Sequence, residues 1–88
     1  MEFEFDPEKS GTNRVKHGIN FEEAQALWLD DRRIIEMARS GDEIRKMIIA
    51  SIGGKCWTGF YTYRKDRIRI ISVRSSRHEE KEHYVQGL

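Results

Sequence analysis

The sequence predicts an α+β fold with the element order β-α-α-β-β-β-β-α, an antiparallel sheet with two N-terminal helices and a C-terminal helix. Three observations indicate this fold. Helix-start signals stand near the N-terminus, β-branched and aromatic stretches separated by tight turns fill the middle, and helix-forming residues fill the end. Because the helices are grouped and do not alternate with strands, the pattern favours α+β over a parallel α/β sheet.

A short strand and a first helix are expected at the N-terminus. Residues 3–5 alternate apolar and acidic side chains, as strands do. Asp6 can accept hydrogen bonds from the free N–H groups of a first helical turn, and the proline after it suits the first helical position. This helix should end at about residues 16–17, because Gly18 can adopt a left-handed conformation.

A second helix is expected to follow after a tight turn. Asn20 and Glu23 have the spacing of a capping box, in which each side chain accepts a hydrogen bond from the backbone N–H of the other residue. The apolar side of this helix consists of Phe21, Ala24, Leu27 and Trp28.

Four strands and a last helix are expected in the rest of the chain. The strands should span about residues 33–38, 44–52, 56–64 and 67–74, with turns at Ser40-Gly41-Asp42, Gly53-Gly54 and Lys65-Asp66. Such short connections favour an antiparallel meander. Residues 75–86 are rich in helix formers. The apolar residues of this C-terminal segment are only Tyr84, Val85 and Leu88, so the helix can dock by one edge at most.

Length and composition indicate one small domain over residues 1–88, with 35% charged and 38% apolar residues. No apolar run approaches the roughly 20 residues of a membrane span, and the N-terminus lacks a signal pattern. A cytoplasmic protein without membrane contact is therefore expected. Cys56 has no second cysteine for a disulfide or a thiolate metal site.

Charge is distributed unevenly between the two halves of the chain. Residues 1–44 hold 11 acidic and 6 basic residues, whereas residues 45–88 hold 4 acidic and 10 basic residues. A basic half of this kind is typical of a surface that meets polyanions. The alternative is a solvated sheet face beside a charged helix.

Several reaction classes lack their characteristic residues. The three histidines, His17, His78 and His83, have neither a cysteine partner nor an H-E-x-x-H spacing, so no metal is expected. Gly53-Gly54 stands between strands without the pattern of a phosphate loop, so no nucleotide cofactor is expected. A G-x-S-x-G nucleophile motif is also absent.

The remaining Arg, Lys, His, Glu and Tyr side chains suit metal-free cleavage of RNA. In that reaction the 2′-OH of the RNA is the nucleophile, so the protein supplies a base, an acid and cations for the phosphate. Arg64 and Arg74 are the candidates for the phosphate, because each ends a predicted strand and a guanidinium fork matches two phosphate oxygens. Strand pairing is expected to place both away from the Lys65-Asp66 turn.

Two helices offer groups for proton transfer. Arg77, Glu80 and Tyr84 share one face of the last helix. There, Glu80 can act as a base or orient an arginine, and Tyr84 can donate a proton or stack on a base. The alternative is an ordinary ion pair beside a packed tyrosine. His17, in the last turn of the first helix, is either a proton-transfer group or a capping residue.

Together these motifs resemble the BrnT toxin family. Residues 3–24 are similar to its signature F-E-[WF]-D-x-x-K-x-x-x-N-x-x-K-H-G-x-x-F-x-E-A, and residues 74–84 to its R-x(5)-E-x(3)-Y tail. The resemblance implies a RelE-like fold and a type II toxin–antitoxin system, in which the toxin cuts RNA and inhibits translation. It also implies a partner, the ribbon-helix-helix antitoxin BrnA, through which alone operator DNA would be bound.

The resemblance also implies site residues, to which the spacing on the last helix adds Arg77. The catalytic candidates are Arg64, Arg74, Glu80, His17 and Tyr84, and the candidates for RNA binding are Lys16, Arg45, Arg69 and Arg77. The chain departs from the family at two places. Ala50 stands where a glycine is usual, and Ser75-Ser76 stand where Arg or Pro followed by Ala is common. Both departures leave room for an attenuated toxin.

An endoribonuclease toxin is therefore the leading hypothesis, with an antitoxin expected to contact the sheet near Arg64 and Arg74. A non-catalytic nucleic-acid-binding or co-repressor module would use the same basic surface, but would show salt-dependent binding without cleavage. A pure interaction module would neither bind RNA nor be toxic.

Overall fold

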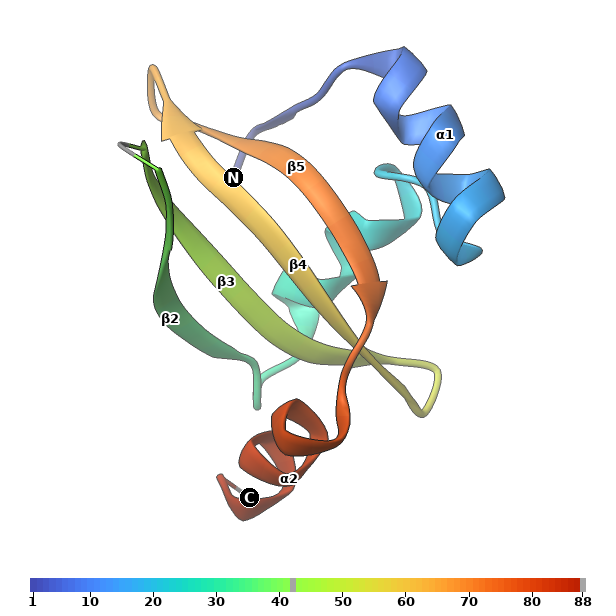
Figure 1. The fold of residues 1–88 in the computed structure, drawn as a ribbon, viewed down its shortest axis with the longest axis vertical. Helices are drawn as coiled ribbons and strands as arrows, with labels where there is room; N and C mark the ends of the chain where they lie inside the picture. Colours follow the sequence, from blue (N-terminus) through green and yellow to red (C-terminus); the bar gives the residue numbers. More distant parts are fainter. Residues whose placement is uncertain (42, 88) are drawn as a thin grey trace.

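The computed structural model describes residues 1–41 and 43–87, and the side chains of these residues except 39, 40 and 43. Its elements follow the expected order in part, because a 3₁₀ helix takes the place of the second N-terminal helix (Figure 1). They are β1 (Phe3–Glu4), α1 (Pro7–His17), the 3₁₀ helix η1 (Glu23–Leu29), β2 (Ile34–Ser40), β3 (Glu43–Ile52), β4 (Lys55–Arg64), β5 (Arg67–Ser75) and α2 (His78–Gln86). The α+β class is thus confirmed.

The capping signals near the N-terminus are confirmed. An Asp6 side-chain oxygen accepts a hydrogen bond from the Glu8 N–H at 2.9 Å, and Gly18, whose φ is 84°, caps the C-terminal end of α1. Asn20 and Glu23 make both hydrogen bonds of a capping box, at 2.8 and 3.0 Å.

The second helix differs from the expected amphipathic α-helix because η1 is a 3₁₀ helix. Its buried side chains are Ala24, Leu27 and Trp28. In a segment of seven residues few i→i+4 hydrogen bonds can form, so packing of these side chains on the sheet decides how the segment winds.

The sheet contains five strands in the order β1-β5-β4-β3-β2. Strands β2 to β5 form the expected antiparallel meander, but β1 pairs with β5 in parallel, with Phe3 opposite Ile68. The expectation of a wholly antiparallel sheet is therefore wrong. Local patterns could not reveal this pairing, because 62 residues separate β1 from β5 in the chain.

The turns between the strands depend on left-handed residues. Gly53 and Gly54 have φ values of 56° and 86°, and Lys65 and Asp66 adopt 50° and 66° despite their side chains. Two-residue loops of this kind suit the twist of a β-hairpin and confirm both turns. In the predicted turn at residues 40–42, Asp42 lies outside the described residues.

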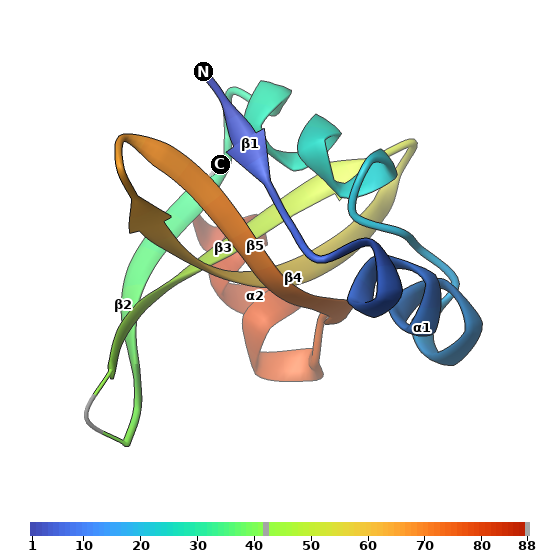
Figure 2. The same ribbon diagram turned by 90° about the horizontal axis from the view of Figure 1, so that it is seen from above.

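The apolar core lies between one face of the sheet and the N-terminal segments. Trp28 of η1 contacts Tyr61 of β4 and Phe3 of β1, with ring centroids 5.1 and 5.0 Å apart. α1 is attached beside β5, because the Asn13 side chain bonds to both backbone groups of Val73. In Figure 2, η1 lies on one side of the sheet and α2 on the other.

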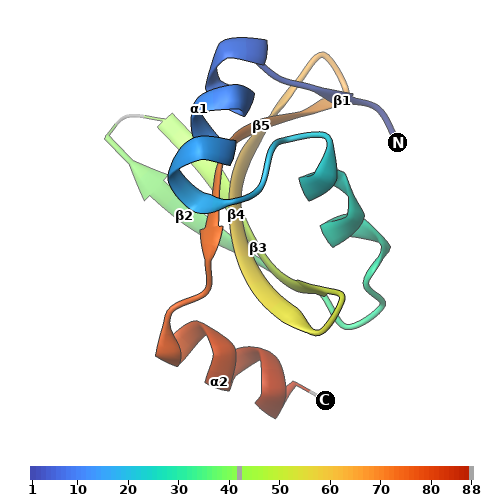
Figure 3. The same ribbon diagram turned by 90° about the vertical axis from the view of Figure 1, so that its right-hand side faces the viewer.

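α2 has no buried residue among residues 78–86 and is held to the rest of the fold by polar contacts. It begins three residues later than expected, because Ser75 still belongs to β5. Figure 3 shows it at the end of the sheet, away from α1 and η1. This agrees with the predicted edge docking; Leu88 lies outside the described residues. Within the described part of the chain, no helix is long and apolar enough to cross a membrane.

Candidate active site

The candidate site lies on the sheet face opposite the apolar core, where α2 begins. Because side chains alternate along a strand, this face carries Thr58 and Phe60 of β4 and, across from them, Arg74 and Ser72 of β5. By the same alternation, Arg45 and Met47 of β3 lie on this face too. We call it the open face, since η1 covers the other one.

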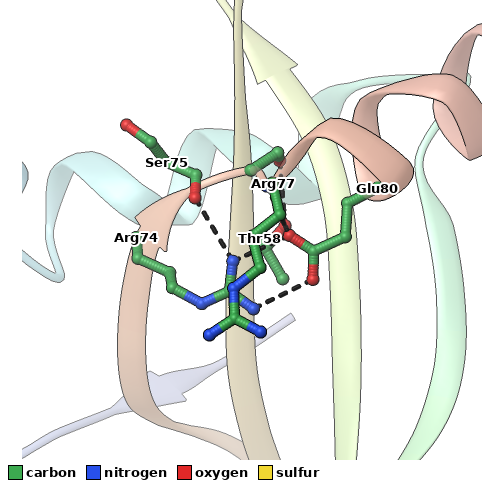
Figure 4. A network of polar contacts seen from close by, with 6 residues as sticks. Thr58, Arg74, Ser75, Arg77 and Glu80 are labelled. Carbon is green, nitrogen blue, oxygen red and sulfur yellow. Dashed lines mark hydrogen bonds and ion pairs between the residues drawn. The ribbon is translucent and has the colours of Figure 1, made fainter.

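Arg74 and Glu80 form the centre of the site (Figure 4). Nη1 of Arg74 donates to Oε1 of Glu80 at 2.7 Å, and Nη2 donates to Oε2 at 2.9 Å. The two side chains are only 22% and 13% exposed. A bidentate pair of this kind is directional and sheltered from water, so the guanidinium is held in one orientation.

Further hydrogen bonds hold the Glu80 carboxylate in place. Besides Arg74, its Oε1 accepts hydrogen bonds from the Arg77 N–H at 2.7 Å and from the Thr58 hydroxyl at 3.0 Å. The hydrogen bonds from Arg74, together with those from Arg77 and Thr58, lower the pKa of Glu80 to about 2. Glu80 is therefore ionised near neutral pH, and its geometry suits orienting an arginine rather than acting as a base.

The Arg74 guanidinium lies over an aromatic ring on the open face. Its central carbon is 5.4 Å from the centroid of Phe60. Hydrogen bonding to Glu80 is the main cause that raises the pKa of Arg74, so the cation is permanent. A fixed cation beside an aromatic ring can bind a phosphate while a nucleobase stacks nearby.

Tyr84 occupies a separate position, one turn further along α2. Its hydroxyl donates to an Asp30 side-chain oxygen at 2.5 Å, and the same oxygen accepts from the Ser51 N–H at 2.9 Å. The hydrogen bond to Asp30 raises the pKa of Tyr84 to about 12. This arrangement anchors α2 to the segment before β2, as in the packed-tyrosine alternative. Sequence reasoning missed Asp30, for which no local signal existed.

Arg64 lies far from Arg74. It pairs with Arg67 directly beside the Lys65-Asp66 turn, whereas Arg74 pairs with Thr58 near the other end of the two strands. At roughly 3.3 Å per residue, the six positions between Thr58 and Arg64 correspond to about 20 Å. The expected placement of Arg64 away from this turn is therefore wrong: Arg64 is the residue directly before the turn, and the hairpin pairs it with Arg67. The structure does not bring both arginines to one phosphate.

The other predicted residues are dispersed. Lys16 and His17 end α1, and no hydrogen bond or ion pair among the described residues joins either to Arg74 or Glu80. Arg69 pairs with Glu4 of β1 at 3.2 Å. Arg45 is half-buried on the open face, and Arg77 is exposed at the start of α2.

A histidine–carboxylate pair also joins α2 to the sheet. Nε2 of His83 lies 2.8 Å from Oε1 of Glu36, which stands opposite Met47 on the open face. His83 follows Glu80 by three residues, so the two side chains lie on neighbouring parts of one helix surface. That spacing could have indicated His83 from the sequence, whereas nothing pointed to Glu36. In the part of the chain described, no three His, Cys, Asp or Glu residues gather as metal ligands.

The ion pair at the centre of the site makes folding stability depend on pH. The folded-state pKa of Glu80 is depressed, so its contribution is present above about pH 4.5 and is lost as the pH falls towards 2. We expect Glu80→Gln to lower the free energy of unfolding at pH 7 by on the order of 2 kcal/mol and to flatten its decline over this acidic range. Urea unfolding from pH 2 to 7 measures both effects. Glu79→Gln is the matched control, and a wild-type pH dependence in Glu80→Gln would contradict the prediction.

Comparison with known proteins adds the family. The family model described as the ribonuclease toxin BrnT of type II toxin–antitoxin systems matches residues 5–80. No curated protein matches the sequence. The matched segment includes Arg74 and Glu80 and ends before His83 and Tyr84. Because the match spans most of the 88 residues, the chain belongs to the BrnT family of ribonuclease toxins of type II toxin–antitoxin systems.

Proposed function

We propose that this protein is a metal-independent endoribonuclease toxin that inhibits translation in the cytoplasm by cutting RNA. The observation that carries the proposal is the sheltered, bidentate Arg74–Glu80 pair on the open face of a chain from a ribonuclease toxin family. A RelE-like arrangement, in which the sheet presents the substrate site, is consistent with this geometry.

The proposed reaction uses the RNA's own hydroxyl as nucleophile. A bond forms between the 2′ oxygen and phosphorus while the bond from phosphorus to the 5′ oxygen breaks. A base takes the proton of the 2′-OH, and the departing 5′ oxygen takes up a proton. The products are a 2′,3′-cyclic phosphate and a 5′-OH end. Arg74 stabilises the charge that develops on the phosphate oxygens, and Glu80 holds Arg74 in place.

Glu80 and Tyr84 are both poorly suited to proton transfer near neutral pH, given pKa values of about 2 and about 12. Histidine is the side chain most often used for this task. We therefore assign the proton transfer to His83. Glu36 orients its side chain, and it follows Glu80 by three residues on α2. His83 would take the proton from the 2′-OH and return it to the 5′ oxygen.

Replacement of His83 by glutamine is expected to slow cleavage by about 100-fold, because one proton-transfer group is removed. His78→Gln removes a similar pair, His78–Glu82 at 2.9 Å, from an exposed part of α2 and serves as the control. Single-turnover cleavage rates of the two variants and of wild type, measured at one near-neutral pH, test the assignment, and equal rates of the two variants would refute it.

Basic and aromatic residues on and around the open face support an RNA path. Arg45 and Phe60 lie on this face, with Arg69 near its β1 edge and Arg77 exposed beside the central pair. Arg64, about 20 Å along β4 from Thr58, would contact a remote part of the RNA. Lys16 and His17, in the last turn of α1 beside β5, would only steer the approach of the RNA.

Membership of a type II system implies an antitoxin partner. We propose a BrnA-like ribbon-helix-helix protein, with operator DNA bound only by the complex. Large apolar side chains left exposed at the far end of the core-facing side of the sheet support a protein partner; they are Ile35, Met37, Ile44 and Tyr63.

The direct experiment is to incubate the purified protein with total cellular RNA in EDTA and to determine the chemistry of the new ends. Cuts that end in a 2′,3′-cyclic phosphate, and that disappear when the cognate antitoxin is added, support the proposal. RNA that is bound in a salt-dependent way but never cut, with or without ribosomes, would instead identify a binding module.

A further inference from the structure

Two buried hydroxyl groups lie behind the Arg74–Glu80 pair. Thr58, on β4 directly opposite Arg74, is 0% exposed, and Ser76, just after β5, is 6% exposed. Their side-chain oxygens are 2.8 Å apart. The Ser76 N–H donates to the Cys56 carbonyl at 3.1 Å, which fixes the backbone that carries its hydroxyl. Buried hydroxyls of this kind remain only where they make hydrogen bonds.

The ionised state of Glu80 determines which of the two hydroxyls donates and which accepts in each hydrogen bond. Ionised Glu80 can only accept, so the single proton of the Thr58 hydroxyl points to Oε1 of Glu80, 3.0 Å away. The bond between Thr58 and Ser76 must then use the Ser76 proton, with the Thr58 oxygen as acceptor. The result is a relay from Ser76 through Thr58 to Glu80 and on to Arg74, in which each bond polarises the next.

Resting on the proposed function, we infer that Thr58 and Ser76 are positioning residues that lock the Glu80 carboxylate and thereby aim the Arg74 guanidinium at the RNA phosphate. Among the described residues, Oε1 of Glu80 has three donors, whereas Oε2 has only Arg74. Loss of the Thr58 hydroxyl leaves the carboxylate free to tilt about its remaining contacts. Arg74 follows, because both of its terminal nitrogens are bonded to that carboxylate.

This arrangement assigns a role to the Ser76 hydroxyl. In the sequence, the departure from the family at Ser75-Ser76 left room for an attenuated toxin, because alanine is common at the second of these positions. In the structure its hydroxyl supplies the proton for the Thr58 oxygen. We therefore expect Ser76→Ala to weaken the site rather than to improve it.

The test compares Thr58→Val and Ser76→Ala with wild type. Small misplacements of a positioning group cost up to about 100-fold in rate, so we expect Thr58→Val to lower kcat by about 10- to 30-fold with KM changed less than about threefold. Ser76→Ala should lower kcat by about threefold. Titration of the Glu80 carboxyl by ¹³C NMR should show its pKa raised in Thr58→Val, because a donor to the ionised form is gone.

Two further variants exclude a general effect on the strand. Thr62→Val changes the same face of β4, where the hydroxyl donates to the Ile44 carbonyl at 3.4 Å, and should leave kcat and the Glu80 titration unchanged. Thr58→Ser retains the hydroxyl and should restore both. An unshifted Glu80 titration in Thr58→Val, a failure of Thr58→Ser to restore it, or an equal shift in Thr62→Val would each overturn the inference.

The titration also separates this inference from the proposed function. Should the wild-type protein cut no RNA, the proposed function fails, whereas the Glu80 pKa and the NMR order of the Arg74 Nε–H still report whether Thr58 and Ser76 hold the pair. A raised Glu80 pKa and a more mobile Arg74 in Thr58→Val support the relay; wild-type values of both contradict it.

Discussion

Replacement of Arg74 by alanine is expected to reduce single-turnover RNA cleavage by about 1,000-fold while RNA affinity falls by less than about tenfold. A fixed cation that meets charge developing in the transition state contributes several kcal/mol to the rate, whereas one phosphate contact among many contributes little to ground-state binding. Arg74 is such a fixed cation, because both terminal nitrogens of its guanidinium donate to the Glu80 carboxylate oxygens, at 2.7 and 2.9 Å.

Arg74→Lys gives a sharper version of this test. A lysine keeps the charge but is a point cation that cannot reproduce the planar, two-bond pairing with Glu80. It should therefore recover binding and only a small part of the rate. Measured rates and affinities with one labelled RNA would separate the two effects.

The matched control is Arg67→Ala, at the opposite end of β5, where the side chain is half-exposed and pairs with Glu2 at 3.2 Å. It should cleave at close to the wild-type rate. Far-UV circular dichroism should confirm that each variant is folded. Cleavage by a folded Arg74→Ala protein within tenfold of wild type would remove Arg74 from the reaction centre.

The second large effect concerns stability and a residue remote from the chemistry. Asn13, 6% exposed on α1, donates to the carbonyls of Ile19 and Val73 at 2.8 and 2.9 Å and accepts from the Val73 N–H at 3.2 Å. Asn13→Ala leaves three buried backbone groups without this partner. At about 1 to 3 kcal/mol for each buried group left unpaired, the loss should reach about 3 to 5 kcal/mol.

Such a loss is a large share of the stability of a domain this small and should lower Tm by about 15 °C or more. Thermal and urea unfolding measure it. Asn13→Asp, which keeps an acceptor for Val73 but no donor, should lie between alanine and wild type. Thr12→Ala, at the exposed neighbouring position, is the control. If Asn13→Ala lowered Tm by no more than Thr12→Ala does, the role assigned to Asn13 would be contradicted.

The sequence alone was sufficient to predict an element wherever the interaction that stabilises the element is local. The Asp6 cap, the left-handed Gly18 and the reciprocal bonds of Asn20 and Glu23 each join residues at most four positions apart, so they form in almost any surroundings. The turn at Gly53-Gly54 likewise depends on its own φ values. These local signals, with the strand-forming stretches between them, determined the element order and the meander.

Tertiary structure decided which of these elements meet. Three features depend on how distant segments are placed in the sheet. They are the parallel pairing of β1 with β5, the separation of Arg64 from Arg74, and the pairing of His83 with Glu36. The sequence by itself determined that an arginine and a glutamate stand near the junction of the last strand and the last helix. Only the fold brought them over Thr58 and Phe60, because contacts between distant segments depend on how the core packs and not on any local pattern.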